Sequence, residues 1–196
     1  VSIANTTHGT DSGLITGGIG IESLGVDAAS LSIDNAGTII GTYITGAGIG
    51  VQGDALYLTN AASGYIGSPG NGVDIVYDYA SSTITNLGTI AAGSGNDAIE
   101  FIDPLSGTPA DNTVINAGLI SASGGTAIGF ADGDDTLQID PGASFVGTVD
   151  GGAGTNRLIL AEGTNAGFFG GLGSQFLNFE QIDVAANAKW SLTGAN

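Results

Sequence analysis

The sequence predicts an all-β protein, specifically a right-handed parallel β-helix (β-solenoid) of about seven or eight rungs with an aromatic-rich C-terminal cap. Three observations predict it: a composition that disfavours helices, two motifs that recur with one period, and alternating apolar residues within each repeat. Of the 196 residues, 36 are Gly, whereas Lys and Arg together supply 2. Because Gly weakens helices and the usual helix formers are scarce, a helical bundle is excluded.

The first recurring motif contains Asn-x-Gly. It reads "IDNAGTI" from Ile33, "ITNLGTI" from Ile84 and "VINAGLI" from Val114, and "LTNAASGYI" from Leu58 is a copy with two extra residues. The anchoring asparagines follow one another at steps of 25, 26 and 30 residues and are Asn35, Asn60, Asn86 and Asn116. A repeat of this length is typical of a solenoid, in which each repeat stacks on its neighbours.

A second motif keeps the same order along the chain. It is "GIGI" from Gly18, "GIGV" from Gly48, "GVDI" from Gly72, "AIEF" from Ala98 and "AIGF" from Ala127. Apolar residues alternate with small or polar ones in both motifs, which is the periodicity of strands. Gly, Asn, Asp and Ser then divide each unit into two or three short strands. Without helices to cover a sheet, the chain buries its alternating residues by coiling.

The Asn of each Asn-x-Gly motif has a structural role in this prediction. Asn tolerates the left-handed backbone conformation at a corner of the coil. Its amide can also bond to the equivalent amides one rung above and below. We therefore expect Asn35, Asn60, Asn86 and Asn116 to form a ladder.

The Asn-x-Gly repeats occupy residues 1–130, and from Phe130 onward other motifs replace them. Residues 131–196 begin with turn motifs such as "DGDDT" and "GGAGTN" and end with "FLNFEQIDVAANAKWSLTGAN". We expect them to form the terminal rungs, continuous with the first part.

The closing segment resembles the C-terminal end of the passenger region in type V autotransporters, the self-exporting surface proteins of Gram-negative bacteria. The family pattern Phe-x-Asn-Phe-Glu-x-Ile-x-Val followed by Trp-x-Leu-x-Gly is matched here by Phe176, Asn178, Phe179, Glu180, Ile182, Val184, Trp190, Leu192 and Gly194. The closing motif matches directly over about 20 residues, and a looser match extends over about 65 residues in total.

The resemblance implies a function and a location. The chain is expected to be a passenger segment, exported across the outer membrane and displayed at the cell surface or secreted. Residues 131–196 would be its autochaperone-like folding core, and a membrane β-barrel of the same chain would be its partner. A solenoid end needs a cap of large apolar side chains, and the candidates are Phe168, Phe169, Phe176, Phe179 and Trp190. The segment is predicted to serve as a stalk with an adhesive role.

Composition bounds the partners. The formal net charge is −17, and the two basic residues, Arg157 and Lys189, lie 32 positions apart. Nucleic acid is excluded as a partner, because phosphate backbones need clustered Lys and Arg. There is no Cys, so neither a disulfide framework nor a thiolate metal site can form. The chain starts at Val1 rather than Met, which favours a piece of a longer protein whose signal peptide has been removed.

Enzymatic activity is not predicted. His8 in "THGTDSG" has a faint likeness to a subtilisin-like motif, but no matching Ser motif follows it. The alternative function is a carbohydrate-active β-helix enzyme, a polysaccharide lyase or hydrolase. A lyase needs a strong base, commonly Arg or Lys, and the two basic residues, Arg157 and Lys189, lie in the closing section, away from the loop-bearing rungs. Paired carboxylates of a hydrolase stay open, because neighbouring rungs can bring any two acids together.

No cofactor is predicted, but calcium is a weak candidate ligand. "DGDDTLQI" from Asp132 and "GGAGTNRLI" from Gly151 resemble the nonapeptides of calcium-binding solenoids. The two copies stand about 20 residues apart, so successive turns cannot share ions as nonapeptides do. Turn chemistry explains both copies, and the remaining candidate ligands are Asp132, Asp134 and Asp150.

The tyrosines are the last candidate site. All five lie within 37 residues of one another and are Tyr43, Tyr57, Tyr65, Tyr77 and Tyr79. Two pairs, Tyr43 with Tyr65 and Tyr57 with Tyr79, are each 22 residues apart, which is near one rung. They are expected to stack and stabilise neighbouring strands. The functional alternative is an exposed platform for a host glycan or surface protein.

Overall fold

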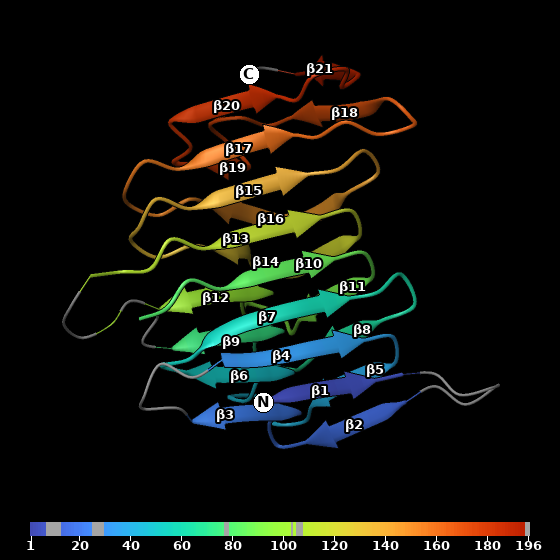
Figure 1. The fold of residues 1–196 in the computed structure, drawn as a ribbon, viewed down its shortest axis with the longest axis vertical. Helices are drawn as coiled ribbons and strands as arrows, with labels where there is room; N and C mark the ends of the chain where they lie inside the picture. The colour runs from blue at the N-terminus through green and yellow to red at the C-terminus, as the bar shows by residue number, and fades with distance from the viewer. Residues whose placement is uncertain (7–12, 25–29, 77–78, 103, 105–107, 195–196) are drawn as a thin grey trace.

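The computed structural model describes residues 1–6, 13–24, 30–76, 79–102, 104 and 108–194, and it confirms the all-β solenoid. These residues form 21 strands and no helix, and the strands coil from the N-terminus to the C-terminus (Figure 1). Within the described ranges, therefore, no helix is long and apolar enough to cross a membrane.

The first sheet runs the length of the molecule. Its eight parallel strands stack in chain order and hold the anchoring Asn of each repeat in one register, as in the pairing of Asn60 with both Asn35 and Asn86. The strands are β1 (Ser2–Asn5), β4 (Ser30–Asn35), β7 (Ala55–Asn60), β10 (Thr83–Asn86), β13 (Thr113–Asn116), β15 (Thr136–Ile139), β17 (Arg157–Leu160) and β20 (Gln181–Val184).

The second sheet has two arms that meet in one long strand, β14 (Leu119–Gly129). The arm that follows the first sheet in each turn contains β2 (Leu14–Gly17), β5 (Thr38–Gly41), β8 (Tyr65–Gly67) and β11 (Thr89–Ala92). The other arm contains β3 (Ile21–Leu24), β6 (Ile49–Gln52), β9 (Val73–Val76) and β12 (Ile99–Ile102). Beyond β14, the strand β16 (Ser144–Asp150) continues both arms and pairs with β19 (Phe176–Leu177).

The coil is right-handed and closes seven turns between β1 and β20. In Figure 1 the near strands run to the right, the far strands run to the left, and the chain climbs throughout. A separate two-stranded sheet, β18 (Gly167–Gly170) with β21 (Trp190–Thr193), lies at the C-terminal end. The predicted number of rungs and the predicted direction of pairing are confirmed.

One apolar core fills the coil, because every second strand residue points inward. Fully buried side chains follow one another along the axis in each sheet, for example Ile33, Ile84 and Leu137 in the first sheet. Phe101 and Phe130 stack face to face inside, with ring centroids 5.3 Å apart. The core is therefore built mainly from aliphatic side chains of moderate size, which suits a narrow coil.

The C-terminal aromatic cluster differs in part from the predicted cap. Phe169 and Phe176 are buried with ring centroids 5.0 Å apart, and Phe145 joins them edge-on, 5.4 Å from Phe176. Phe179 and Trp190 are partly buried and pack against the core. Phe168 was wrongly assigned to the cap: it is 76% exposed, because adjacent strand residues point to opposite sides and Phe169 takes the inward position.

The ladder asparagines lie at the ends of their strands without the predicted left-handed backbone. Among the described residues other than Gly, positive φ angles occur at Asn178 and Asn187. The corners at the ladder are instead turned by the residues that follow each Asn, so this part of the sequence prediction is wrong.

Candidate functional site

A row of acidic side chains lines the outer face of the arm that contains β3, β6, β9 and β12. The register places Glu22, Gly50, Asp74, Glu100 and Gly129 on consecutive strands. Each alternates with buried residues of its own strand, so it faces outward. Asp74 therefore has a carboxylate neighbour, Glu100, on one side and a glycine, Gly50, on the other.

Asp74 is the most perturbed acid of the row. Its Oδ1 atom is buried and has no hydrogen-bond partner within the part of the chain that the structure describes. Burial, and secondarily the charge of Glu100, raises the pKa of Asp74 from 3.8 to about 6. Both causes act against the charged form, so Asp74 holds its proton at a higher pH than an ordinary carboxyl group.

Glu100 is held in place by neighbouring polar groups. The side-chain amide of Asn71 donates to Oε2 of Glu100, and Oδ1 of Asn71 accepts from the backbone N–H of Asp97 at 3.1 Å. Oδ1 of Asp97 in turn accepts from the backbone N–H of Thr126 at 2.7 Å. Burial raises the pKa of Glu100, the bond from Asn71 opposes that rise, and Asp97 adds to it.

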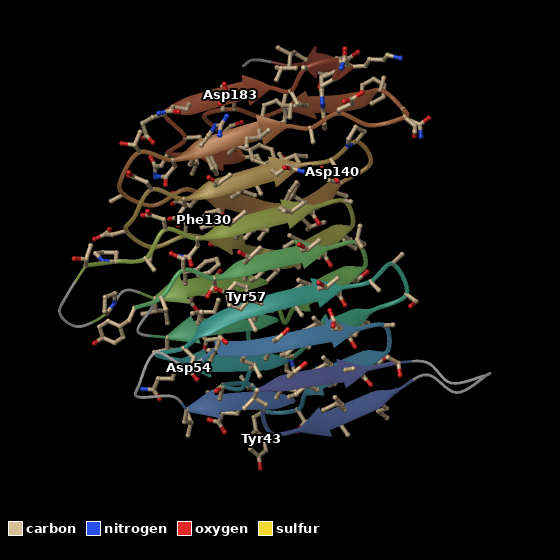
Figure 2. The ribbon with its side chains drawn as sticks, viewed as in Figure 1. Tyr43, Asp54, Tyr57, Phe130, Asp140 and Asp183 are labelled. Atoms are coloured by element: carbon tan, nitrogen blue, oxygen red, sulfur yellow. The ribbon has the colours of Figure 1, made fainter. Side chains whose placement is uncertain are left out.

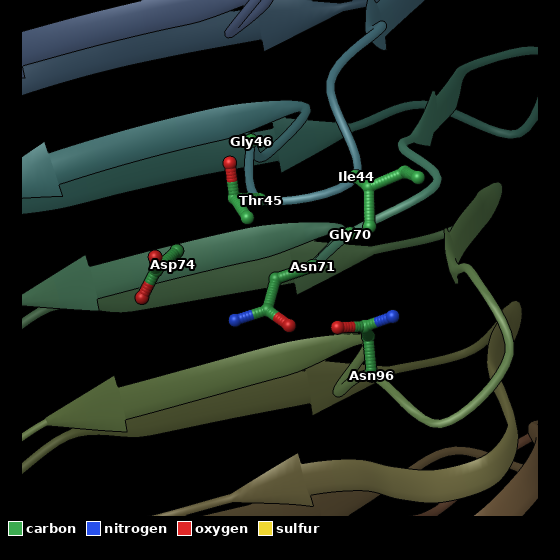
Figure 3. Close-up of a pocket in the computed structure, with 7 residues that line it drawn as sticks. All are labelled: Ile44, Thr45, Gly46, Gly70, Asn71, Asp74 and Asn96. Atoms are coloured by element: carbon green, nitrogen blue, oxygen red, sulfur yellow. The ribbon is translucent and has the colours of Figure 1, made fainter.

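Two hollows flank Asp74. The first has a volume of about 100 Å³ and is lined by polar side chains of Thr45, Asn71, Asp74 and Asn96, with Ile44 at its edge (Figure 3). Figure 3 shows Asn71 between Asp74 and Asn96.

The second hollow has a volume of about 180 Å³ and lies on the other side of Asp74, toward Glu22, Ser23 and Gln52. It opens where Gly50 contributes no side chain. Asp74 is the one acid that lines both hollows, and apolar side chains such as Ile19, Leu24 and Val76 also line the second.

The arrangement allows limited chemistry. Facing residues on neighbouring parallel strands lie about 4.8 Å apart, so Asp74 and Glu100 can share a proton or bind hydroxyl groups together. The sequence analysis missed this pair, although its signal is visible. "GVDI" and "AIEF" carry an acid at the same offset in the second motif, and residues at one offset face each other in a solenoid.

The anchoring asparagines make a continuous ladder of side-chain amides inside the coil. Nδ2 of Asn35 donates to Oδ1 of Asn60, Nδ2 of Asn60 to Asn86, and Nδ2 of Asn86 to Asn116, at 2.8, 2.8 and 2.9 Å. Asn5 is a further member that the sequence analysis missed, since Gly does not follow it at the usual offset; it donates to Asn35 at 2.8 Å. The ladder binds rungs to one another and presents no surface to a ligand.

A second internal series lies where each turn enters the first sheet. Side-chain oxygens in one rung accept backbone N–H groups of the rung before it: Ser82 accepts from Leu56, Asn112 from Ser82, Asp135 from Asn112, Asn156 from Asp135 and Glu180 from Asn156. The residues Asp135, Asn156 and Glu180 come from the "DGDDT", "GGAGTN" and "NFEQ" stretches. Those stretches thus have a structural role in the coil.

The calcium candidates are engaged in turns. Oδ1 of Asp134 accepts from the backbone N–H of Thr155 at 2.7 Å, and Oδ1 of Asp150 accepts from Gly152 at 3.0 Å and from Asn178. Asp132 also interacts within the chain. Within the described ranges, no group of three or more acids and histidines is placed to hold a metal ion.

The tyrosines do not form the predicted stacks. Tyr57 faces outward from the first sheet between Ser32 and Thr83 (Figure 2), and Tyr65 pairs with Thr38 and Thr89 on the second sheet. Tyr43 lies in the turn after β5, against Gly18, and Tyr79 precedes β10. The spacing of 22 residues is shorter than these rungs, so the register pairs Tyr65 with Thr38 rather than Tyr43, and Tyr57 with Thr83 rather than Tyr79. Tyr77 and His8 lie outside the described residues.

The two basic residues lie far along the coil from the acidic pair. Arg157 forms an exposed ion pair with Asp183 on the first sheet, and Lys189 precedes β21. Neither lines the hollows beside Asp74. Comparisons with protein-family models, with curated proteins and with solved structures gave no match.

Proposed function

We propose that the chain is a β-helical stalk segment of a surface-exposed or secreted autotransporter passenger, with its folding core at the C-terminal end. The observation that carries this proposal is the first sheet, whose eight strands stack in register from β1 to β20. Rungs joined by sheet pairing and by an internal amide ladder make a stiff rod. The resemblance of the closing segment to passenger ends supports the location.

The folding-core role rests on the aromatic cluster. Phe145, Phe169 and Phe176 pack together in the terminal rungs, and Trp190 covers part of that end. A compact cluster gives these rungs a core that forms locally, on which preceding rungs can stack. The partner in export is the membrane β-barrel of the parent chain, and the adhesive role belongs to the exposed outer faces.

Surface display tests this proposal. Residues 1–196 are fused to an outer-membrane β-barrel translocator, and exposure is measured by protease digestion of intact Gram-negative cells. We expect efficient display, and a strong loss of display for Phe176→Ala, which removes a buried ring. Phe168→Ala, an exposed ring eight positions away, is the matched control and should be displayed normally. Equal display of both variants, or failure of the parent chain to reach the surface, contradicts the proposal.

A second candidate function is hydrolysis of a polysaccharide at Asp74 and Glu100. It is favoured by one observation: two carboxyl groups face each other on neighbouring strands, and one of them, Asp74, has a pKa raised to about 6 and lines both hollows. An acid that keeps its proton near neutral pH beside a second carboxylate is the requirement for glycoside cleavage. A lyase is less well supported, because Arg157 and Lys189 are remote from this surface.

Release of reducing ends from a panel of neutral and acidic polysaccharides tests the second candidate. If it holds, Asp74→Asn and Glu100→Gln each lower the rate by a factor of about 100 or more. Asp34→Asn, which removes an exposed acid from the first sheet, should leave the rate unchanged. Absence of release by the parent chain across the panel rules this candidate out.

A further inference from the structure

The second sheet is interrupted between β16 and β18. In the turns below, strands at this position pair continuously from β2 through β5, β8, β11 and β14 to β16. The far side of β16 pairs with β19 only at Val149 and Asp150. Within the described ranges, no strand pairs with that side of β16 from Ser144 to Thr148.

The strand that would fill this position, β18, pairs elsewhere. Its four residues pair with β21 and with no other strand of the described chain. Figure 1 shows β18 beside β21 at the top of the coil, with β16 below it beside β14. Two strand edges therefore border one gap. Among the described residues, β18 pairs with β21, and the part of β16 from Ser144 to Thr148 pairs with β14.

A glutamine side chain occupies part of the gap. Nε2 of Gln175 donates to the backbone carbonyl oxygens of Phe145 and Gly147, at 3.3 and 3.1 Å. In a complete sheet these two carbonyl groups would accept N–H groups from the next strand. The amide of Gln175 thus supplies the kind of donor that an added strand would supply.

The gap contains a hollow with aromatic walls. Its volume is about 220 Å³, and its lining includes the rings of Phe145, Phe168, Phe169 and Phe176. Phe169 and Phe176 are buried, whereas Phe168 is exposed at the rim. None of the lining residues is charged, although the chain as a whole carries a charge of −17.

We propose that the gap between β16 and β18 binds an extended peptide segment of a partner protein, which adds to the sheet as a strand. Open backbone edges give an extended chain its hydrogen bonds, and a hollow beside them selects its side chains. The aromatic walls call for an apolar side chain at the centre of the segment. The uncharged lining and the acidic molecule around it favour basic residues at the ends. The proposal goes beyond the stalk role and does not depend on export.

Peptide titration of the purified chain tests this proposal. The probe is a pool of short capped peptides with Lys at both ends and Thr alternating with Val, Ile, Leu, Phe or Tyr between them. We expect saturable micromolar binding by fluorescence anisotropy. The same pool with Pro at its central positions should not bind, since Pro lacks the N–H that pairs with the strand edge. No binding by the first pool, or equal binding by the second, overturns the proposal.

A substitution locates the binding. Gln175→Ala frees the carbonyl groups of Phe145 and Gly147, so peptide affinity should rise about fivefold to tenfold. Gln138→Ala is the matched control, because Gln138 lies on the first sheet and donates to Asp140. We expect no change in affinity for it. Unchanged affinity in Gln175→Ala overturns the proposal.

Hydrogen exchange gives an independent readout on the unaltered chain. Bound peptide should slow amide exchange in residues 144–148 and 167–170 and leave the first sheet unaffected. Slowing confined to other residues overturns the proposal. So does sedimentation showing that the chain fills the gap by forming dimers that the peptide does not dissociate.

Discussion

The inward position that the ladder asparagines occupy in the first sheet is taken by aliphatic residues in the last three rungs. Five rungs place Asn there, up to Asn116, and the next rungs place Ile139, Leu160 and Val184 in the same register. A buried amide is tolerated when its donors and acceptors are satisfied. The ladder satisfies them along the axis, and above Asn116 aliphatic packing replaces it.

Asn60→Ala should strongly destabilise the coil. Asn60 accepts from Asn35 and donates to Asn86, both at 2.8 Å, so its loss leaves two buried amides without these partners. We expect the free energy of unfolding to fall by about 2–4 kcal/mol, measured with chemical denaturant. Asn116→Ile should cost less, because the next rung already has Ile139 at this position. Equal costs for the two substitutions would show that the ladder bonds do not carry the stabilisation.

Asp74 should make stability depend on pH. Burial first, and Glu100 second, raises its pKa to about 6, so the folded chain binds the proton more tightly than the unfolded chain does. The resulting stabilisation is complete below the unfolded pKa of 3.8 and is lost as pH rises through about 6. We expect the melting temperature to fall between about pH 4 and pH 7, and Glu100 adds in the same direction.

Asp74→Asn should remove much of this slope. At pH 7 the variant should be more stable than the parent by about 1–2 kcal/mol, after allowance for the partial exposure of Asp74. Asp34→Asn removes the same charge from an exposed position and should keep the slope. Melting curves of both variants across this range decide the matter, and an unchanged slope in Asp74→Asn would contradict the assignment.

The strand pair β18–β21 closes the C-terminal end of the coil through a close contact between the ring of Trp190 and Gly167. Trp190 pairs with Gly167, and its Nε1 donates to the carbonyl oxygen of Ala161 at 2.9 Å. A Cβ atom on Gly167 would lie 2.4 Å from the ring. Gly167 therefore provides the space in which Trp190 covers the core.

Gly167→Ala should displace the ring of Trp190. We expect a loss of about 2–3 kcal/mol in the free energy of unfolding, because the added methyl group meets a ring rather than a flexible chain end. Trp190 is the only Trp, so a red shift of its fluorescence reports its exposure directly. Gly129→Ala is the control, since its Cβ would meet nothing closer than 3.8 Å. If Gly167→Ala keeps the parent emission, the contact is not tight.

Across the whole molecule, burial is greatest in the middle rungs and declines toward both ends. Core residues from Ile33 to Leu160 are almost fully buried, whereas Ile3 and Ile15 in the first turn are only partly buried. In the last turn, three apolar residues pair with buried ones of the turn below but are themselves exposed. They are Ile182 (paired with Leu158, 41% exposed), Val184 (paired with Leu160, 57%) and Leu192 (paired with Phe169, 63%). The aromatic cluster lies just below that turn.

Amide exchange should therefore be slowest between about residues 84 and 176 and faster in β1, β2 and β20. Rungs contact mainly their neighbours, so a solenoid opens from its weaker end without losing the rest. Partial proteolysis should accordingly leave a fragment that contains the middle rungs and the aromatic cluster. Exchange in β1 as slow as in β13 or β15 would contradict this.

The sequence was sufficient for the architecture because one recurrent feature, alternation around Asn-x-Gly, encodes both strand direction and register. It was insufficient where the orientation of a side chain depends on a shift of one residue or on the exact length of a rung. Phe168 and Phe169 are adjacent in the sequence and face opposite ways, and Tyr65 pairs with Thr38 instead of Tyr43 because rungs vary in length. No motif in the sequence indicated that β18 pairs with β21 and not with β16.

The amide ladder also makes the length of this molecule easy to change. Asn60 and Asn86 are 26 residues apart, and the segment between them is one complete turn with an amide at its end. A genetic duplication of residues 61–86 would insert a further turn whose Asn meets the same neighbours that the original Asn had. A duplicated turn would therefore pack against its neighbours through contacts that the chain already contains. Proteins with different numbers of turns can thus evolve from one ancestral solenoid.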